Sequence, residues 1–195
     1  MKKILFILLL LSTALHAQML KLGEAKGLFL SAGVGPKIPV GAFADKCNPG
    51  SGFDFSLSYT DNAVMPVFIN LSAGYTHFPG SQNLYSASDY SSFSSNAITA
   101  SLGVRYYLPP IMEQFVIIMP VVDCSLLYTN FNDFHQFKQE TKKSSFNENY
   151  SKLGFQAGAG ISMFMFDIMA YYNYLQDHNS VEVDLRARIP IFISM

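Results

Sequence analysis

The sequence has few charged residues, no tryptophan and only two cysteines. Of its 195 residues, 13 are Lys or Arg and 14 are Asp or Glu, and this charged fraction of 14% compares with about a quarter in soluble domains. The balanced charge, without a basic stripe, excludes nucleic acid as a partner. Half of the residues are apolar at a net charge of −1, which excludes a disordered chain. The length suits one domain.

The first 17 residues have the three parts of a secretory signal peptide. Two lysines follow the first methionine, an apolar run covers residues 4–11, and small residues follow it up to Ala17. This run is too short to cross a bilayer as a helix. We predict a signal peptide over 1–17, with cleavage after Ala17 and cleavage after Ala14 as the alternative. A short periplasmic lead over 18–26 then precedes a barrel domain over 27–195.

Apolar and small polar residues alternate with a period of two through most of the remaining chain. Such alternation is typical of strands whose two faces meet different surroundings. Six segments show it clearly, and two, 116–129 and 168–174, are less regular. The sequence therefore predicts eight strands, near residues 28–35, 53–59, 67–76, 97–106, 116–129, 153–163, 168–174 and 181–191.

The polar face of these strands carries Gly, Ser and Thr beside nearly balanced charges, and it has almost no lysine. Small residues beside paired charges fit a narrow lumen filled by side chains, and the apolar face would then meet lipid. The predicted fold is an all-β, eight-stranded antiparallel up-and-down transmembrane β-barrel. A secreted lipocalin-like barrel is the alternative. The predicted polar network of the lumen comprises Asp54, Arg105, Asp123, Glu182, Asp184, Arg186 and Arg188.

Connections of two lengths alternate along the chain. Long connections are expected at 37–51, 80–93 and 130–150, with a shorter one at 175–180. The connections between them, at 61–65, 109–114 and 166–167, are short. Long external loops that alternate with short periplasmic turns are typical of outer-membrane barrels with both termini inside. We therefore expect a protein of the Gram-negative outer membrane.

Three segments resemble the small outer-membrane β-barrel family, especially its PorT-like branch and more distantly OmpA- and OmpX-type barrels. They are residues 33–43 with Gly33-Val34-Gly35, residues 101–109 (SLGVRYYLP), and the closing strand 183–193. The resemblance implies outer-membrane lipid and lipopolysaccharide as surroundings and the barrel-insertion machinery as a partner during biogenesis. Many such barrels end on an aromatic residue, whereas Phe192 here stands three positions before the end.

The polar residues outside the strands offer few sites for catalysis or metal binding. His178, Ser180 and Glu182 contain the groups of an activated nucleophile, but polar residues are ordinary in a loop of this kind. His77 and His135 have no second ligand at metal spacing. We expect no enzyme activity, no cofactor and no metal. Cys47 and Cys124 are expected to be free thiols, with Cys124 on the apolar face.

The long connection 130–150 mixes aromatic and cationic side chains, which favours binding of a protein, a glycan or lipopolysaccharide phosphates. We expect a structural or binding protein that acts through its external loops. A component of a secretion or surface-assembly apparatus, as the PorT-like resemblance implies, and an outer-membrane lipid hydrolase are the alternatives. We also expect this loop to be dispensable for folding but required for the biological role. Its candidate contacts are Phe131, Phe134, Phe137, Lys138, Lys142, Lys143 and Phe146.

Overall fold

The computed structural model describes residues 26–61, 65–111, 118–141 and 143–194. The predicted signal peptide and nearly all of the predicted periplasmic lead lie outside these residues. No helix in the described ranges is long and apolar enough to cross a membrane. Within the described residues, three short helical segments lie in the connections: α2 (Ala42–Lys46), α3 (Gln82–Ala87) and η1 (Gln139–Thr141). The strands are β1 (Lys26–Pro39), β2 (Gly50–Asp61), β3 (Met65–Pro79), β4 (Tyr90–Tyr107), β5 (Ile118–Phe137), β6 (Phe146–Met163), β7 (Phe166–Leu175) and β8 (Ser180–Ser194).

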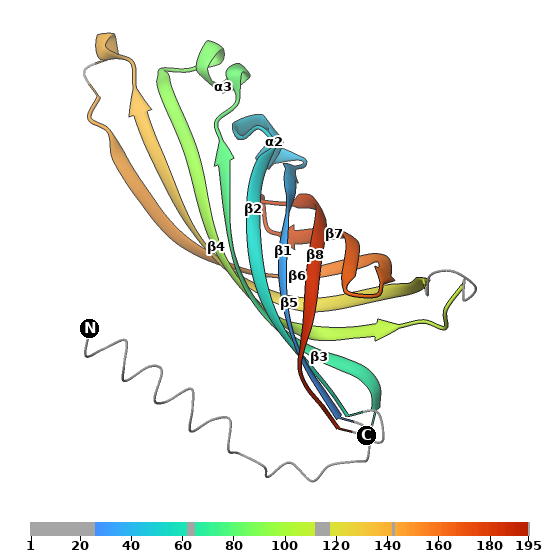
Figure 1. The fold of residues 1–195 in the computed structure, drawn as a ribbon. Coiled ribbons are helices and arrows are strands. Elements are labelled where there is room, and N and C mark those ends of the chain that lie inside the picture. The colour runs from blue at the N-terminus through green and yellow to red at the C-terminus, as the bar shows by residue number, and fades with distance from the viewer. Residues whose placement is uncertain (1–25, 62–64, 112–117, 142, 195) are drawn as a thin grey trace, which may run out of the picture.

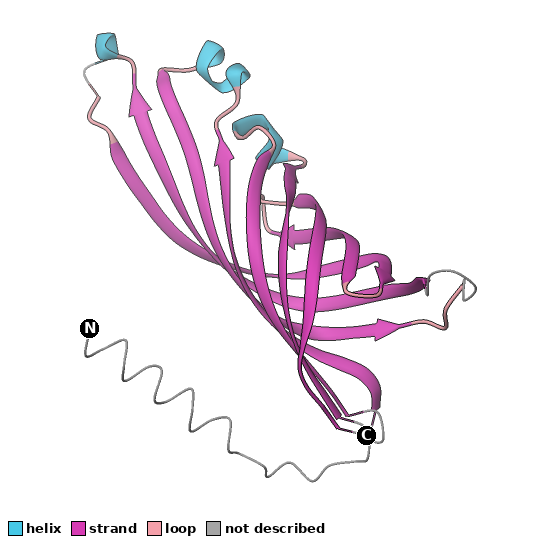
Figure 2. Ribbon diagram, viewed as in Figure 1, coloured by secondary structure: helices cyan, strands magenta, loops and turns pink. Residues whose placement is uncertain are grey.

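Each strand pairs antiparallel with the next one along the chain, and β8 pairs antiparallel with β1 to close the ring (Figures 1 and 2). Ala32 illustrates the closure, because it lies opposite Phe55 on one side and Ala187 on the other. Closure leaves no sheet edge with unpaired backbone groups. The eight-stranded, antiparallel, up-and-down barrel predicted from the sequence is confirmed.

The two ends of the barrel differ. The three helical segments lie at one end, here called the helix-bearing end, and the opposite end carries the first residue of β1 and the last of β8 (Figure 1). At the helix-bearing end the strands are joined by residues 40–49, 80–89, 138–145 and 176–179. The hairpin of β5 and β6 projects beyond the connection that holds α2 (Figure 1).

The prediction that residues 130–150 form a loop is wrong in its extent. The ladder between β5 and β6 continues to the pair of His135 with Phe146, so the connection covers only 138–145. Residues 37–39 and 90–93 are likewise strand rather than loop. In this projecting hairpin Asn132 and Asp133 occupy opposite faces, and so do Phe134 and His135. Because neither face there is uniformly apolar, the alternation that identified the other strands is missing.

The outward face of the barrel is apolar and the inward face is polar. Leu126, Leu153 and Ile98 point outward and are 70%, 78% and 61% exposed. Inward positions hold small or charged residues, and Gly158 shows why they must be small. A Cβ atom on Gly158 would lie 2.2 Å from the ring of Tyr171, which crosses the lumen at that point. The predicted orientation of the two strand faces is thus confirmed.

Candidate functional site

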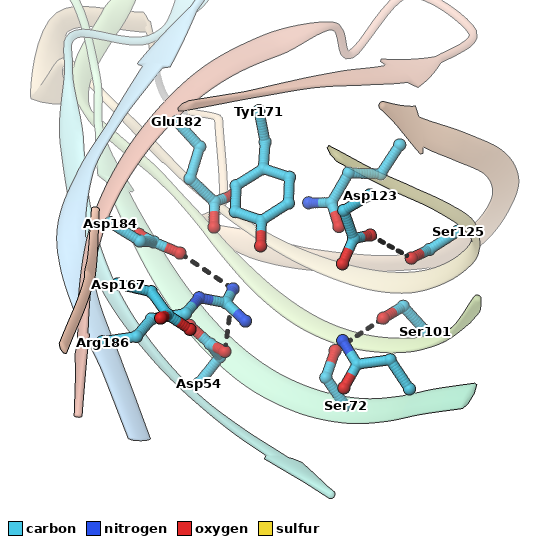
Figure 3. Close-up of polar contacts among 12 residues, drawn as sticks. Asp54, Ser72, Ser101, Asp123, Ser125, Asp167, Tyr171, Glu182, Asp184 and Arg186 are labelled. Atoms are coloured by element: carbon cyan, nitrogen blue, oxygen red, sulfur yellow. Dashed lines mark hydrogen bonds and ion pairs between the residues drawn. The ribbon is translucent and has the colours of Figure 1, made fainter. Parts of the chain in front are cut away.

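The lumen contains an ion-pair network that begins at Arg105 on β4. Its Nε lies 2.9 Å from Oδ2 of Asp123, the residue opposite it on β5. Arg105 also contacts two residues of β7: Nη1 lies 3.5 Å from Oδ2 of Asp167, and Nη2 donates to the Tyr171 hydroxyl at 2.9 Å. Asp123 accepts a further hydrogen bond from Ser125 at 2.8 Å, seen in Figure 3. One arginine therefore ties three strands together across the lumen.

A second group of charges surrounds Arg186 on β8. Its Nη2 lies 3.0 Å from Oδ1 of Asp54 and 3.1 Å from Oδ2 of Asp184 (Figure 3). Lys37 of β1 forms ion pairs with Glu182 and, at 3.7 Å, with Asp184. These five side chains are all buried. Among the described residues, the carboxylates of Asp54, Glu182 and Asp184 are the only group whose oxygens converge closely enough to hold a metal ion. Lys37 and Arg186 already supply the positive charge there.

Arg188 forms the third group, nearer the end of the barrel that carries the termini. Its Nη2 lies 3.2 Å from Oδ1 of Asp167 and donates to the Ser162 hydroxyl at 2.8 Å. Its Nη1 donates to the hydroxyl of Tyr107. Asp167 thus lies between Arg105 and Arg188 and connects the first group to the third.

The structure places all seven residues of the predicted network inside the barrel. Sequence reasoning missed four further members with charged or phenolic side chains, Lys37, Tyr107, Asp167 and Tyr171. Lys37 lies in a segment where a long loop is expected and Asp167 in one where a tight turn is expected, so neither is part of the predicted network. Tyrosine counts as an apolar residue in the alternation pattern, so the two tyrosines do not stand out in the sequence. Only their hydroxyl groups join the network. Tyr107 lies two residues after Arg105 and therefore on the same inward face of β4, and this spacing could have identified Tyr107.

An apolar plug closes the lumen on the other side of the network. Phe43 of α2 enters the barrel and is 2% exposed. Its ring centroid lies 4.9 Å from that of Phe78, 6.1 Å from that of Phe131 and 4.7 Å from that of the His178 imidazole. Aromatic pairs at such separations stabilise a core beyond the area they bury. The buried apolar cluster comprises Phe43, Cys47, Phe78, Phe93, Ala97, Leu127, Phe131 and Leu175.

A cavity of about 380 Å³ opens at the helix-bearing end, between the β5–β6 hairpin and the plug. We call it the vestibule. Tyr150 lies in its wall, where its hydroxyl donates to Oδ2 of Asp133 at 2.8 Å and lies 2.7 Å from Nε2 of His178. Burial and the hydrogen bond to Asp133 raise the pKa of Tyr150. The vestibule is lined by Lys46, Leu84, Tyr90, Phe93, Asp133, His135, Glu148, Tyr150, Lys152, Asp177 and His178.

The seven candidate loop contacts have different surroundings. Phe131 is buried in the plug, and its expected role as an exposed contact is therefore wrong. Phe134 and Phe146 are exposed, while the Phe137 ring stacks on that of Tyr90. The remaining three are lysines. Lys138 donates to the carbonyls of Tyr85 and Ser88, Lys143 pairs with Asp89 at 2.8 Å, and Lys142 lies outside the described residues.

The structure does not join His178 and Ser180 as a nucleophile and its base. Nε2 of His178 lies 2.7 Å from the Tyr150 hydroxyl and Nδ1 lies 3.3 Å from the Gln176 carbonyl, while Ser180 accepts from Asn173 at 3.2 Å. Burial, together with the nearby Lys152, lowers the pKa of His178. Such an imidazole is neutral near pH 7, and here it is held in the plug.

Both cysteines are free thiols, as expected. Cys124 is exposed on the outward face of β5. Cys47 is buried beside the plug, at a bridge to Gly80. Burial, with the Asp133 carboxylate nearby, raises the pKa of Cys47 to about 12.

No family model and no curated protein matches the sequence. Solved structures do match. The N-terminal β-barrel domain of Pseudomonas aeruginosa OprF is 15% identical with a TM-score of 0.50, and the match covers 86% of this chain and 99% of that one. Neisserial surface protein A has 16% identity, a TM-score of 0.49 and coverages of 85% and 97%. Ail, the attachment invasion locus protein of Yersinia pestis, is 13% identical with a TM-score of 0.43, and the match covers 86% of this chain and 99% of that one.

At these identities the likeness concerns the fold alone. The OprF domain supports the small-barrel architecture that the OmpA-type resemblance implied. The PorT-like branch of that resemblance stays a prediction.

Proposed function

We propose that this chain is an integral outer-membrane β-barrel with a closed lumen, which acts as a structural or binding protein through its helix-bearing end. The observation that carries the proposal is the reversed polarity of the barrel. Large apolar side chains are exposed on all eight strands, while charged side chains are buried inside. Exposed apolar surface of this extent is unfavourable in water and favourable in lipid. Closure of the ring also satisfies the backbone groups without water.

The contents of the lumen support a structural or binding role over a pore. Eight strands leave an interior about as wide as the side chains that fill it. Arg105, Arg186 and Arg188 cross that interior, and Phe43 closes it toward the helix-bearing end. An exported chain would have to displace both barriers. A secretion or surface-assembly role therefore rests on the PorT-like resemblance alone, and we favour a protein without transport or catalytic activity.

The helix-bearing end supports the binding role. In outer-membrane barrels the longer connections face outward and the short turns face the periplasm. By this rule α2, α3 and the β5–β6 hairpin lie outside the cell, where binding residues gather on a rigid scaffold. Lipopolysaccharide would adjoin the outward face, and a protein or glycan partner would meet the vestibule.

Fractionation combined with gel mobility tests the proposal. The protein should be recovered with outer membranes, and in detergent it should migrate differently before and after boiling, because a folded barrel resists unfolding by the detergent at room temperature. Recovery in the periplasm without detergent would contradict the proposal and would favour the lipocalin-like alternative. A defect in exported cargo after deletion of the gene would instead select the secretion role.

A further inference from the structure

Two carboxylates face each other across the β5–β6 ladder in the wall of the vestibule. Asp133 lies directly opposite Glu148, and both line the cavity. Like charges at directly opposed positions destabilise an antiparallel pair. The sequence nevertheless places both at the inward face of the projecting hairpin. A positive charge between them would remove the repulsion.

Two buried polar atoms in the same wall have no hydrogen-bond partner in the described structure: Oδ1 of Asp133 and Nε2 of His135. Asp133 is 7% exposed and His135 is 8% exposed. Leaving a buried polar atom unsatisfied costs about 1–3 kcal/mol. Asp133 and His135 both line the vestibule, so a donor that enters the wall between them would satisfy the two atoms.

The other polar atoms of these two side chains are already held in place. Oδ2 of Asp133 accepts from Tyr150, and Nδ1 of His135 lies 3.1 Å from the Tyr90 hydroxyl. When Nδ1 carries the proton and donates to Tyr90, Nε2 presents a lone pair to the cavity. Glu148 adds a third acceptor, with Oε2 3.6 Å from that Nε2. The Asp133 carboxylate and the His135 ring are therefore held in place before any ligand arrives.

The spacing of the acceptors favours an organic cation over a metal ion. Asp133, His135 and Glu148 do not converge at metal-binding separations, unlike the carboxylate group in the lumen. A donor group binds its acceptors at about 2.9 Å, whereas metal–ligand bonds measure about 2.1 Å. The acceptors around a bound donor therefore lie farther apart than the ligands around a metal ion. The aromatic side chains of Tyr90 and Phe93 also line the cavity, and aromatic faces attract ammonium and guanidinium groups.

Among the described residues, the remaining charged groups of the vestibule form no ion pair with Asp133, His135 or Glu148. Lys152 donates to the Gln176 carbonyl and lies over the Tyr150 ring, 5.7 Å from its centroid. Lys46 is exposed at the end of α2, and Asp177 is exposed in the turn between β7 and β8. The cavity of about 380 Å³ falls within the size range of small-ligand sites.

We propose that the vestibule binds an organic cation on an alkyl stem, held by Asp133, His135 and Glu148 within an aromatic wall. The cation is either a free alkylamine or a lysine or arginine side chain of a partner protein. The inference deepens the proposed function, because it rests on the vestibule facing outside the cell and names the chemistry of its partner.

Calorimetry on the folded, full-length mature protein in a non-ionic detergent tests the site near neutral pH. The probes are n-pentylamine, with n-pentanol as its uncharged equivalent, and a blocked glycine–lysine–glycine peptide, with norleucine replacing lysine as its control. The charged probes should bind and their uncharged counterparts should not. Tighter binding of the peptide would assign the cation to a protein partner, and tighter binding of pentylamine to a free amine; either supports the site.

Three variants locate the binding. Asp133→Asn and Glu148→Gln should each weaken it by about tenfold or more, which corresponds to about 1.4 kcal/mol. Glu148 is exposed, so its substitution preserves the fold if Asp133→Asn does not. Asp89→Asn, which removes an exposed carboxylate paired with Lys143 outside the vestibule, should bind like the wild type.

Unchanged binding in Glu148→Gln, or no binding of either charged probe, would overturn the proposal. The boiling-dependent gel shift, measured on the same samples, separates this failure from failure of the barrel itself.

Discussion

Arg105 and Asp123 form an ion pair between paired positions of β4 and β5, with 2.9 Å between Nε and Oδ2. The same guanidinium donates to Tyr171 on β7, on another wall of the barrel. Each backbone ladder joins only neighbouring strands, whereas the hydrogen bond from Arg105 to Tyr171 joins β4 to β7. It links strands that are not adjacent and holds the lumen closed.

Breaking this pair on one side should destabilise the barrel strongly. Arg105→Met leaves the buried Asp123 carboxylate without its cation, which typically costs about 3–5 kcal/mol. The double variant Arg105→Met/Asp123→Leu should lose less stability than the single variant, because no charge is left alone. Urea unfolding in lipid vesicles measures both. Equal or greater loss in the double variant would show that the pair itself, rather than the isolated charge, determines the effect.

Cys47 should react slowly with thiol reagents while the plug is intact. Its burial and raised pKa, about 12, keep it protonated and inaccessible near pH 8. Phe43→Ala removes a 2%-exposed ring beside it and should cost about 3–5 kcal/mol, with faster labelling of Cys47. A Cys124→Ser background leaves a single thiol for the assay. Equally fast labelling with and without Phe43 would place Cys47 outside the plug.

The lowered pKa of His178 predicts a pH-dependent plug. The unfolded chain takes up a proton on this residue at a higher pH than the folded barrel does, so the contribution of neutral His178 to stability is lost as the pH falls through its unfolded value. Between about pH 7.5 and about pH 5.5 the wild type should lose more stability than His178→Gln. Thermal unfolding at both pH values measures the difference. Parallel losses would contradict it.

Two deletions should separate loop from strand at the helix-bearing end. Replacing 138–145 by a short Gly/Ser turn removes only the connection and should leave the gel shift and cation binding close to wild type. Replacing 132–148 removes Asp133, His135 and Glu148 together with their ladder pairs. It should abolish cation binding and lower the unfolding temperature, because the vestibule wall and the packing of Tyr90 on Phe137 are lost. Full binding after the larger replacement would contradict the assignment of the site.

The barrel was predictable from the sequence because lipid and lumen impose opposite requirements on alternate residues. The contrast is clear in adjacent residues: Leu102 faces outward beside the inward Gly103, and Leu126 faces outward beside the inward Ser125. The inward orientation of the seven predicted network residues follows from the same alternation. The network positions of Lys37 and Asp167 do not follow from it, because a long loop is expected at Lys37 and a tight turn at Asp167.

The vestibule was the least predictable part. In the projecting hairpin the outward Asn132 and the inward Asp133 are both polar, so parity no longer separates the faces. The insertion of Phe43 depends on tertiary packing between α2, β3 and β5, which no local pattern reports. The sequence pattern therefore predicts an exposed contact at Phe131, which the structure places in the plug.

The reversed polarity of the barrel is most directly tested with single tryptophans, because the native chain has none. Leu126→Trp and Ile168→Trp place the indole at outward positions on β5 and β7, which are 70% and 41% exposed. Lys143→Trp places it in the connection of the helix-bearing end. In vesicles with brominated lipid tails, the first two should emit at short wavelength and be strongly quenched, while the third should emit as in water and be little affected. Water-like, unquenched emission from Leu126→Trp and Ile168→Trp would contradict a lipid-facing apolar surface.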